Sequence, residues 1–253
     1  MKEIAYGSAV LPRLLCGTSP FMGAGQFGPS GAAWYHQFFN HPERMAELIS
    51  HFCDVGFPGA HIIAYPSIIE AARLVKEKQP FKVTASLLPD DWLENLDGVA
   101  ALEPEVVFVH GSMTDEFLNH QIDELQECLQ AIRDLGAFPG MATHDSYQTL
   151  RALQAEGHPL EQESFGLLLP INHLGWAIGG PLKAVLDLLE KTDARHPVMG
   201  MKVLAAGRLA PDEALDFIFR QVKLPVATVG IVAKEQAEEL ASICQALLSE
   251  LGE

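Results

Sequence analysis

Positively charged residues are scarce in this sequence. Its 253 residues include 17 Lys and Arg against 33 Asp and Glu, which gives a formal net charge of −16. A surface this acidic repels phosphate backbones and anionic lipid headgroups. Nucleic-acid binding and membrane attachment are therefore excluded as main roles, and we expect the partner to be a small-molecule substrate.

Long hydrophobic runs are missing as well. No apolar stretch approaches the roughly 18 to 20 residues that span a bilayer, and the opening MKEIAYGSAVLPRLLCG does not resemble a signal peptide. These features predict a cytoplasmic protein. The cysteines are far apart and form no CxxC pair, so we expect buried free thiols in a reducing compartment at Cys16, Cys53, Cys128 and Cys244.

What the sequence does contain is a repeated alternation of short apolar runs with longer amphipathic stretches. This alternation is typical of βα units and a parallel sheet. Eight such units of about thirty residues account for the whole length, so we predict an α/β fold, a single-domain (β/α)8 TIM barrel over residues 1–253. The oligomeric state stays open. The predicted strands are 14–18, 59–64, 82–86, 106–110, 140–143, 165–169, 198–202 and 227–231.

The segment after the first strand is rich in glycine and aromatic residues. Its stretch GAGQFG, from Gly23 to Gly28, matches the GxGxxG pattern of an open dinucleotide-binding sheet, but two prolines flank it and no amphipathic helix is expected before Pro42. We interpret residues of about 19–41 as a mobile loop lying like a lid over the barrel mouth. The alternative is ordinary packing of that loop, with aromatic residues at Trp34, Tyr35, Phe38 and Phe39.

Histidines follow three consecutive predicted strands. In a βα barrel the carboxyl ends of the strands carry the chemistry, so His110, His144 and His173 are expected to converge at one rim. Together with Asp145 they could hold Zn, Mn or Fe, or one imidazole could serve as a proton donor to a substrate carbonyl. Both readings compete with structural roles, since Asp145 could simply cap a helix.

Two further features follow the last strands. Lys202 ends an apolar strand, where desolvation would lower the pKa of its amine and favour Schiff-base chemistry, unless it only pairs with a carboxylate. The loops after the seventh and eighth strands are where many barrels bind phosphate. Candidate phosphate-binding residues there are Gly207, Arg208, Gly230 and Lys234.

Several stretches resemble the aldo/keto reductases. The resemblance is most specific in MGMKVLAAGRLAPDEALDFIFRQ and ATVGIVAKEQAEELAS. It extends more weakly to GTSPFMGAGQFG, GFPGAHIIAYPSIIEAARLV and VVFVHGS. The resemblance implies a barrel and NADPH-dependent carbonyl reduction by an Asp, Tyr, Lys and His tetrad. His110 matches the histidine, and Tyr65 is the candidate tyrosine although it lies about one position early. The other two positions differ, with His61 or Ile62 for the aspartate and Ser86 or Leu87 for the lysine.

Three functions remain open at this point. The first is a divergent aldo/keto reductase-like enzyme acting on a small carbonyl or sugar-like molecule, with the nicotinamide cofactor against the loops of Gly207 and Gly230. The second is a lyase or isomerase assisted by a divalent metal held by the histidine cluster. The third is a barrel that binds a metabolite without catalysis.

Overall fold

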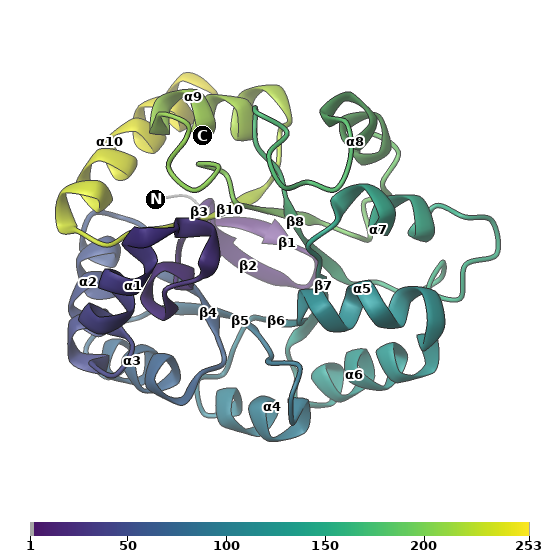
Figure 1. Ribbon diagram of the computed structural model, residues 1–253, viewed down its shortest axis with the longest axis horizontal. Helices are drawn as coiled ribbons and strands as arrows, with labels where there is room; N and C mark the ends of the chain where they lie inside the picture. Colours follow the sequence, from purple (N-terminus) through teal and green to yellow (C-terminus); the bar gives the residue numbers. More distant parts are fainter. Residues whose placement is uncertain (1–2, 253) are drawn as a thin grey trace.

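Eight parallel strands form a closed ring in the computed structural model, which describes residues 3–252 (Figure 1). Each strand pairs with the next along the chain, and the last closes the ring through Ala227 opposite Leu14. The predicted barrel is therefore confirmed, and the predicted strand ends agree with the observed ones to within two residues. The strands are β3 (Leu14–Gly17), β4 (Gly59–Ile63), β5 (Lys82–Ser86), β6 (Val106–Val109), β7 (Phe138–Ala142), β8 (Gly166–Pro170), β9 (Val198–Met201) and β10 (Val226–Gly230).

Helices surround this ring and cover its outer surface (Figure 1). In α2 the buried residues Met45, Ile49 and Phe52 recur at helical spacing, which places one apolar stripe against the strands. Three helices of the barrel, α2, α3 and α9, begin with a proline, whose missing N–H costs nothing in the first turn. The helices are α2 (Pro42–Asp54), α3 (Pro66–Lys76), α4 (Trp92–Ala100), α5 (Gly111–His120), α6 (Ile122–Asp134), α7 (Ser146–Leu153), α8 (Leu182–Leu189), α9 (Pro211–Asp216), the π-helical turn η3 (Phe217–Gln221) and α10 (Lys234–Glu250).

A β-hairpin that the sequence analysis did not predict lies across the ring. It consists of β1 (Glu3–Tyr6) and β2 (Ala9–Pro12), paired antiparallel. Tyr6 is fully buried, packs edge-on against Phe108 and Phe138, and donates a hydrogen bond from its hydroxyl to the Leu167 carbonyl at 3.0 Å. Because Phe138 and Leu167 begin their strands, the hairpin closes the amino-terminal end of the barrel.

The segment after β3 is helical, which corrects the prediction of a loop over 19–41. It contains two 3-10 turns, η1 (Ser19–Met22) and η2 (Gly25–Phe27), followed by the helix α1 (Pro29–Phe38). Gly23 and Gly28 connect these pieces at positive φ, a conformation that glycine adopts without steric cost. The glycine spacing that resembled a dinucleotide fingerprint is thus the spacing of turns between short helices.

The amphipathic stretch between β6 and β7 forms two helices rather than one. The chain leaves the helical conformation at Gln121, whose φ and ψ are −141° and 56°, and divides the stretch into α5 and α6. The division lets α5 begin directly at the end of β6. No helix among residues 3–252 combines the length and apolar character needed to cross a membrane.

Candidate active site

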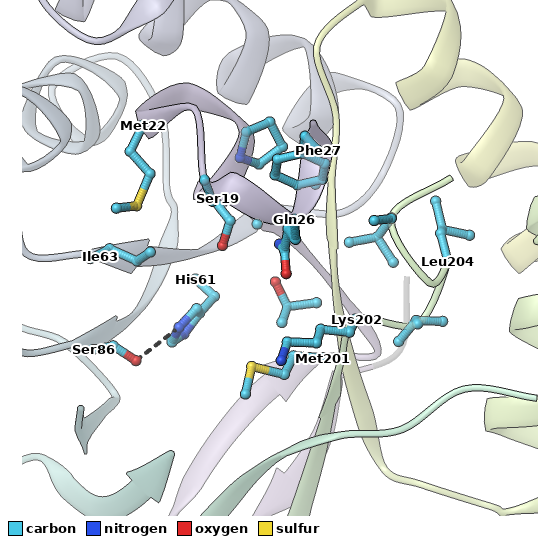
Figure 2. Close-up of a pocket in the computed structure, with 18 of the residues that line it drawn as sticks. Ser19, Met22, Gln26, Phe27, His61, Ile63, Ser86, Met201, Lys202 and Leu204 are labelled. Carbon is cyan, nitrogen blue, oxygen red and sulfur yellow. Dashed lines mark hydrogen bonds between the residues drawn. The ribbon is translucent and has the colours of Figure 1, made fainter. Parts of the chain in front are cut away.

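A cavity of about 410 Å³ lies at the carboxyl ends of the barrel strands (Figure 2). Its polar lining on the strand side comes from six of the eight positions around the ring, and its apolar lining includes Ala142, Leu168 and Met201. The segment of η1, η2 and α1 forms one wall through residues such as Ser19, Gln26 and Trp34. The polar side chains on the strand side are His61, Ser86, His110, His144, Lys202 and Thr228.

His61 is a buried imidazole with both ring nitrogens occupied. Nδ1 lies 3.0 Å from the Thr84 hydroxyl, and Nε2 lies 3.1 Å from the Ser86 hydroxyl, as Figure 2 shows for the second contact. Burial lowers the pKa of His61 to about 4, so the ring is neutral near pH 7. The ring therefore holds a fixed orientation and is not a free acid or base.

His110 combines a structural and a chemical feature. It is the residue before α5, and its Nδ1 accepts a hydrogen bond from the Ser112 backbone N–H at 3.2 Å. A neutral ring that accepts at Nδ1 carries its proton on Nε2. Burial, followed by the neighbouring His144, lowers the pKa of His110 below its usual value. The side chain is thus a neutral hydrogen-bond donor in the cavity.

His144 is held by a carboxylate that the sequence analysis did not identify. Asp115 on α5 lies 3.0 Å from His144 Nδ1 and also accepts from the His144 backbone N–H. Burial alone would raise the pKa of Asp115, but hydrogen bonds from His144 and Thr143 lower it, which keeps the carboxylate charged. The rings of His110 and His144 are 5.7 Å apart.

Gly111 makes this proximity possible. A Cβ atom at this position would lie 2.6 Å from Cε1 of His144, closer than non-bonded atoms approach. The His-Gly pair that follows β6 therefore serves two purposes, since His110 caps the helix and Gly111 leaves space for the second imidazole.

Lys202 follows β9 directly and lines the cavity. Its φ of 56° is unusual for a residue with a side chain. Burial lowers the pKa of its amine, an effect that the charge of Asp115 partly offsets. Figure 2 shows the side chain of Lys202 extending into the cavity, on a different side from His61 and Ser86.

The predicted metal site is not assembled, which corrects that expectation. His173 is directed to Glu213, 2.9 Å from Nδ1, and stacks on Phe217 outside the cavity. Asp145 caps α7 by accepting from the Gln148 N–H at 2.9 Å. Within residues 3–252 no group of three or more His, Cys, Asp or Glu side chains is arranged to hold a metal ion. Only His110 and His144 come together as predicted.

Tyr65 does not line the cavity, so the structure does not support it as the tetrad tyrosine. It directly precedes α3, and its ring packs edge-on against Phe39 at 5.4 Å. The Tyr65 ring therefore contacts Phe39, the residue that follows α1, rather than a ligand in the cavity.

The four predicted phosphate-binding residues divide into two pairs. Gly207 and Gly230 line the cavity. Arg208 instead lies over the Trp176 ring at 4.4 Å and donates to the Ala205 carbonyl, while Lys234 pairs with Glu47 at 2.5 Å. The two cations are thus already engaged, although both are close in sequence to cavity residues.

A closed ring of parallel strands with helices outside it and a polar cavity at the strand carboxyl ends defines the chain as a (β/α)8 barrel. No protein-family model and no curated protein matches the sequence. Solved structures do match over nearly the whole chain. A proposed aldo-keto reductase from Pseudomonas aeruginosa superposes with a TM-score of 0.70 at 15% identity, covering 97% of this chain and 96% of that one.

Two further structures give the same result. An aldo-keto reductase from Klebsiella pneumoniae in complex with NADPH has a TM-score of 0.61 at 18% identity, covering 99% of this chain and 93% of that chain. An aldo/keto reductase from Brucella melitensis has a TM-score of 0.61 at 10% identity, covering 98% of both chains. The chain therefore has the barrel fold of aldo-keto reductases, and the resemblance noted in the sequence is confirmed for the fold.

Proposed function

We propose that the protein is an NADP(H)-dependent oxidoreductase that acts on a small carbonyl compound in the cavity at the strand ends. The observation that carries the proposal is the neutral His110, with its donor nitrogen available, in a partly apolar cavity beside the Asp115–His144 pair. The fold supports it, because one similar structure holds NADPH.

The cavity has features that suit a nicotinamide cofactor. Gly207 and Gly230 form part of the rim without side chains, and the space where a Cβ of Gly207 would lie is open. Backbone can therefore approach a bound dinucleotide closely there. In β10 the hydroxyl of Thr228 lines the cavity and has no hydrogen-bond partner among the described residues, so a polar group of a bound molecule would satisfy it. When bound, the cofactor supplies or accepts a hydride.

His110 would polarise the substrate carbonyl. A neutral imidazole whose Nε2–H points at a carbonyl oxygen stabilises negative charge as it develops, and the low pKa keeps the ring in this form near pH 7. His144 would supply the proton, since its Nδ1 is bound to Asp115 and its protonated ring carries a second proton on Nε2. This pair replaces the tyrosine and lysine of the reductase tetrad.

The experiment combines cofactor binding with turnover. We expect purified protein to quench NADPH fluorescence and to oxidise NADPH with at least one member of a panel of small aldehydes and ketones. The substitution His110→Gln should lower kcat by roughly 10²- to 10³-fold, the usual cost of losing one oxyanion donor. The matched control His173→Gln changes an imidazole outside the cavity and should leave kcat unchanged.

Two outcomes would contradict the proposal. The absence of NADPH fluorescence quenching at high cofactor concentration would exclude a nicotinamide cofactor. Quenching without turnover of any compound would favour a barrel that binds a metabolite without catalysis.

A further inference from the structure

We infer that Lys202 is a nucleophile that forms an imine with a carbonyl compound bound in the cavity. This activity goes beyond hydride transfer and needs no nicotinamide cofactor. It rests on the position of the amine, the absence of partners for it, the backbone that presents it and the acids nearby.

The position of Lys202 suits a reaction with a bound molecule. The residue comes from the end of β9, and its side chain enters the cavity near Met201 and Leu204 (Figure 2). These neighbours cannot hydrogen-bond the amine through their side chains. An amine that emerges from an apolar wall is exposed to a ligand and poorly solvated by water.

The amine also lacks a protein partner. Among residues 3–252, four other lysines form ion pairs, namely Lys76, Lys82, Lys183 and Lys234. Within the described part of the chain, Lys202 has no ion pair or side-chain hydrogen bond through its amine. The carboxylate that acts on it electrostatically is Asp115, which is already bound by Thr143 and His144. Lysine amines that serve stability are normally paired when they are half-buried.

The backbone at this position is strained. Lys202, Ala205 and Ala206 all adopt positive φ within one turn segment, at 56°, 47° and 55°. Residues with a Cβ atom rarely adopt this conformation, and those that do cluster at functional sites. Glycine would relieve the strain at residue 202, so the presence of lysine points to a use for its amine.

The chemistry balances with the groups in the cavity. Burial lowers the pKa of Lys202, which raises the neutral fraction of the amine near pH 7. The nitrogen attacks the carbonyl carbon, and the carbonyl oxygen takes up a proton to give a carbinolamine. Loss of that hydroxyl as water, with a proton from His110 or His144, leaves the C=N bond. Amine and carbonyl compound thus give imine and one water, with no change of oxidation state.

Reductive trapping without nicotinamide tests the inference. We would incubate the full chain with a low concentration of glycolaldehyde and sodium cyanoborohydride at pH 7, and then map modified lysines by peptide mass spectrometry. Trapping adds to the modified lysine the mass of the aldehyde minus one oxygen atom. Because glycolaldehyde reacts with any neutral amine, the result does not depend on knowing the natural substrate.

We expect faster modification of Lys202 than of the exposed Lys183, since burial lowers the pKa of Lys202 and leaves more of its amine neutral, while the ion pair with Asp187 keeps Lys183 charged. In Lys202→Met the fast adduct should vanish, and in the control Lys183→Met it should persist. Equal or slower modification of Lys202 in the wild-type chain would overturn the inference, whatever the fold of the variants. The trap is independent of NADPH quenching, so this failure and that of the proposed oxidoreductase are distinguishable.

Discussion

The three imidazoles that line the cavity differ in what holds their ring nitrogens. His61 has both nitrogens occupied by hydroxyls, His110 has Nδ1 occupied by a backbone N–H, and His144 has Nδ1 bound to Asp115. A ring with two partners is fixed, and a ring with one partner keeps a nitrogen for a ligand. At the scale of single residues, this difference distinguishes His61, whose ring has a structural role, from His110 and His144, whose rings can contact a ligand.

The buried state of His61 should appear in the pH dependence of stability. The unfolded chain protonates this ring near pH 6.5, and the folded chain only near pH 4. The unfolded state binds more protons between these values, so the free energy of unfolding falls as pH falls from 6.5 towards 4. We expect the His61 contribution to this loss to be about 2 kcal/mol between pH 7 and pH 5.

Urea unfolding at the two pH values measures this contribution. The loss of stability should be smaller in His61→Gln than in the wild type by that amount, whatever the absolute stability of the variant. His36→Gln, an exposed histidine on α1, is the control and should keep the wild-type loss. The same pH dependence in His61→Gln and the wild type would show that folding does not lower the pKa of His61.

Strand-end positions were predictable from the sequence, but side-chain directions were not. The rule that barrels carry chemistry at strand carboxyl ends found His110, His144 and Lys202. The same rule also selected His173, which the local chain directs to Glu213 outside the cavity. Asp115 lies inside α5 next to a second acidic residue, Glu116, and nothing in its sequence neighbourhood marks it as the partner of His144.

At the scale of elements, the hairpin of β1 and β2 determines how the barrel interior is closed. The interior core joins Tyr6 and Leu11 of the hairpin to strand residues such as Leu15, Phe108 and Met199. The hairpin escaped sequence prediction because its strands have only four residues each and lack a strict alternation of apolar and polar residues. The cavity at the opposite end therefore sits above a filled core.

Tyr6 should carry much of the stability that the hairpin provides. Truncation in Tyr6→Ala removes a fully buried ring and should lower the free energy of unfolding by about 3 to 5 kcal/mol. Tyr6→Phe keeps the ring and loses the hydrogen bond to Leu167, which should cost about 1 kcal/mol.

Urea titration of both variants checks this order. The control Val10→Ala alters an exposed residue of the same hairpin and should change stability by less than about 0.5 kcal/mol. A loss in Tyr6→Ala no greater than in Val10→Ala would mean that the hairpin does not belong to the cooperative core.

At the scale of the whole molecule, the fold was the most predictable property. Eight repeats of an apolar run and an amphipathic stretch leave few arrangements that bury every apolar face, and ring closure is the one that fits this length. The irregular segment of η1, η2 and α1 was less predictable, because its short helices depend on packing rather than on their own periodicity. Trp34 of α1 nevertheless lines the cavity, as expected for a cover of the barrel mouth.

The structure contains a second cavity that competes with the first as a ligand site. It has a volume of about 440 Å³ and lies between α8 and η3, lined by residues such as Leu189, His196 and Phe217. Its lining includes one imidazole, His196, and not a pair of neighbouring imidazoles such as His110 and His144. We therefore expect a cofactor to bind in the cavity at the strand ends, and the two cavities involve different segments of the chain.

Hydrogen exchange of backbone amides with and without NADPH tests this assignment most directly. We predict that saturating NADPH slows exchange in residues 17–27, 201–207 and 228–236, which border the cavity at the strand ends. Residues 186–198 and 217–225, which border the second cavity, should exchange at the same rate in both conditions. Slower exchange confined to the second set, or no change in either set, would contradict the account.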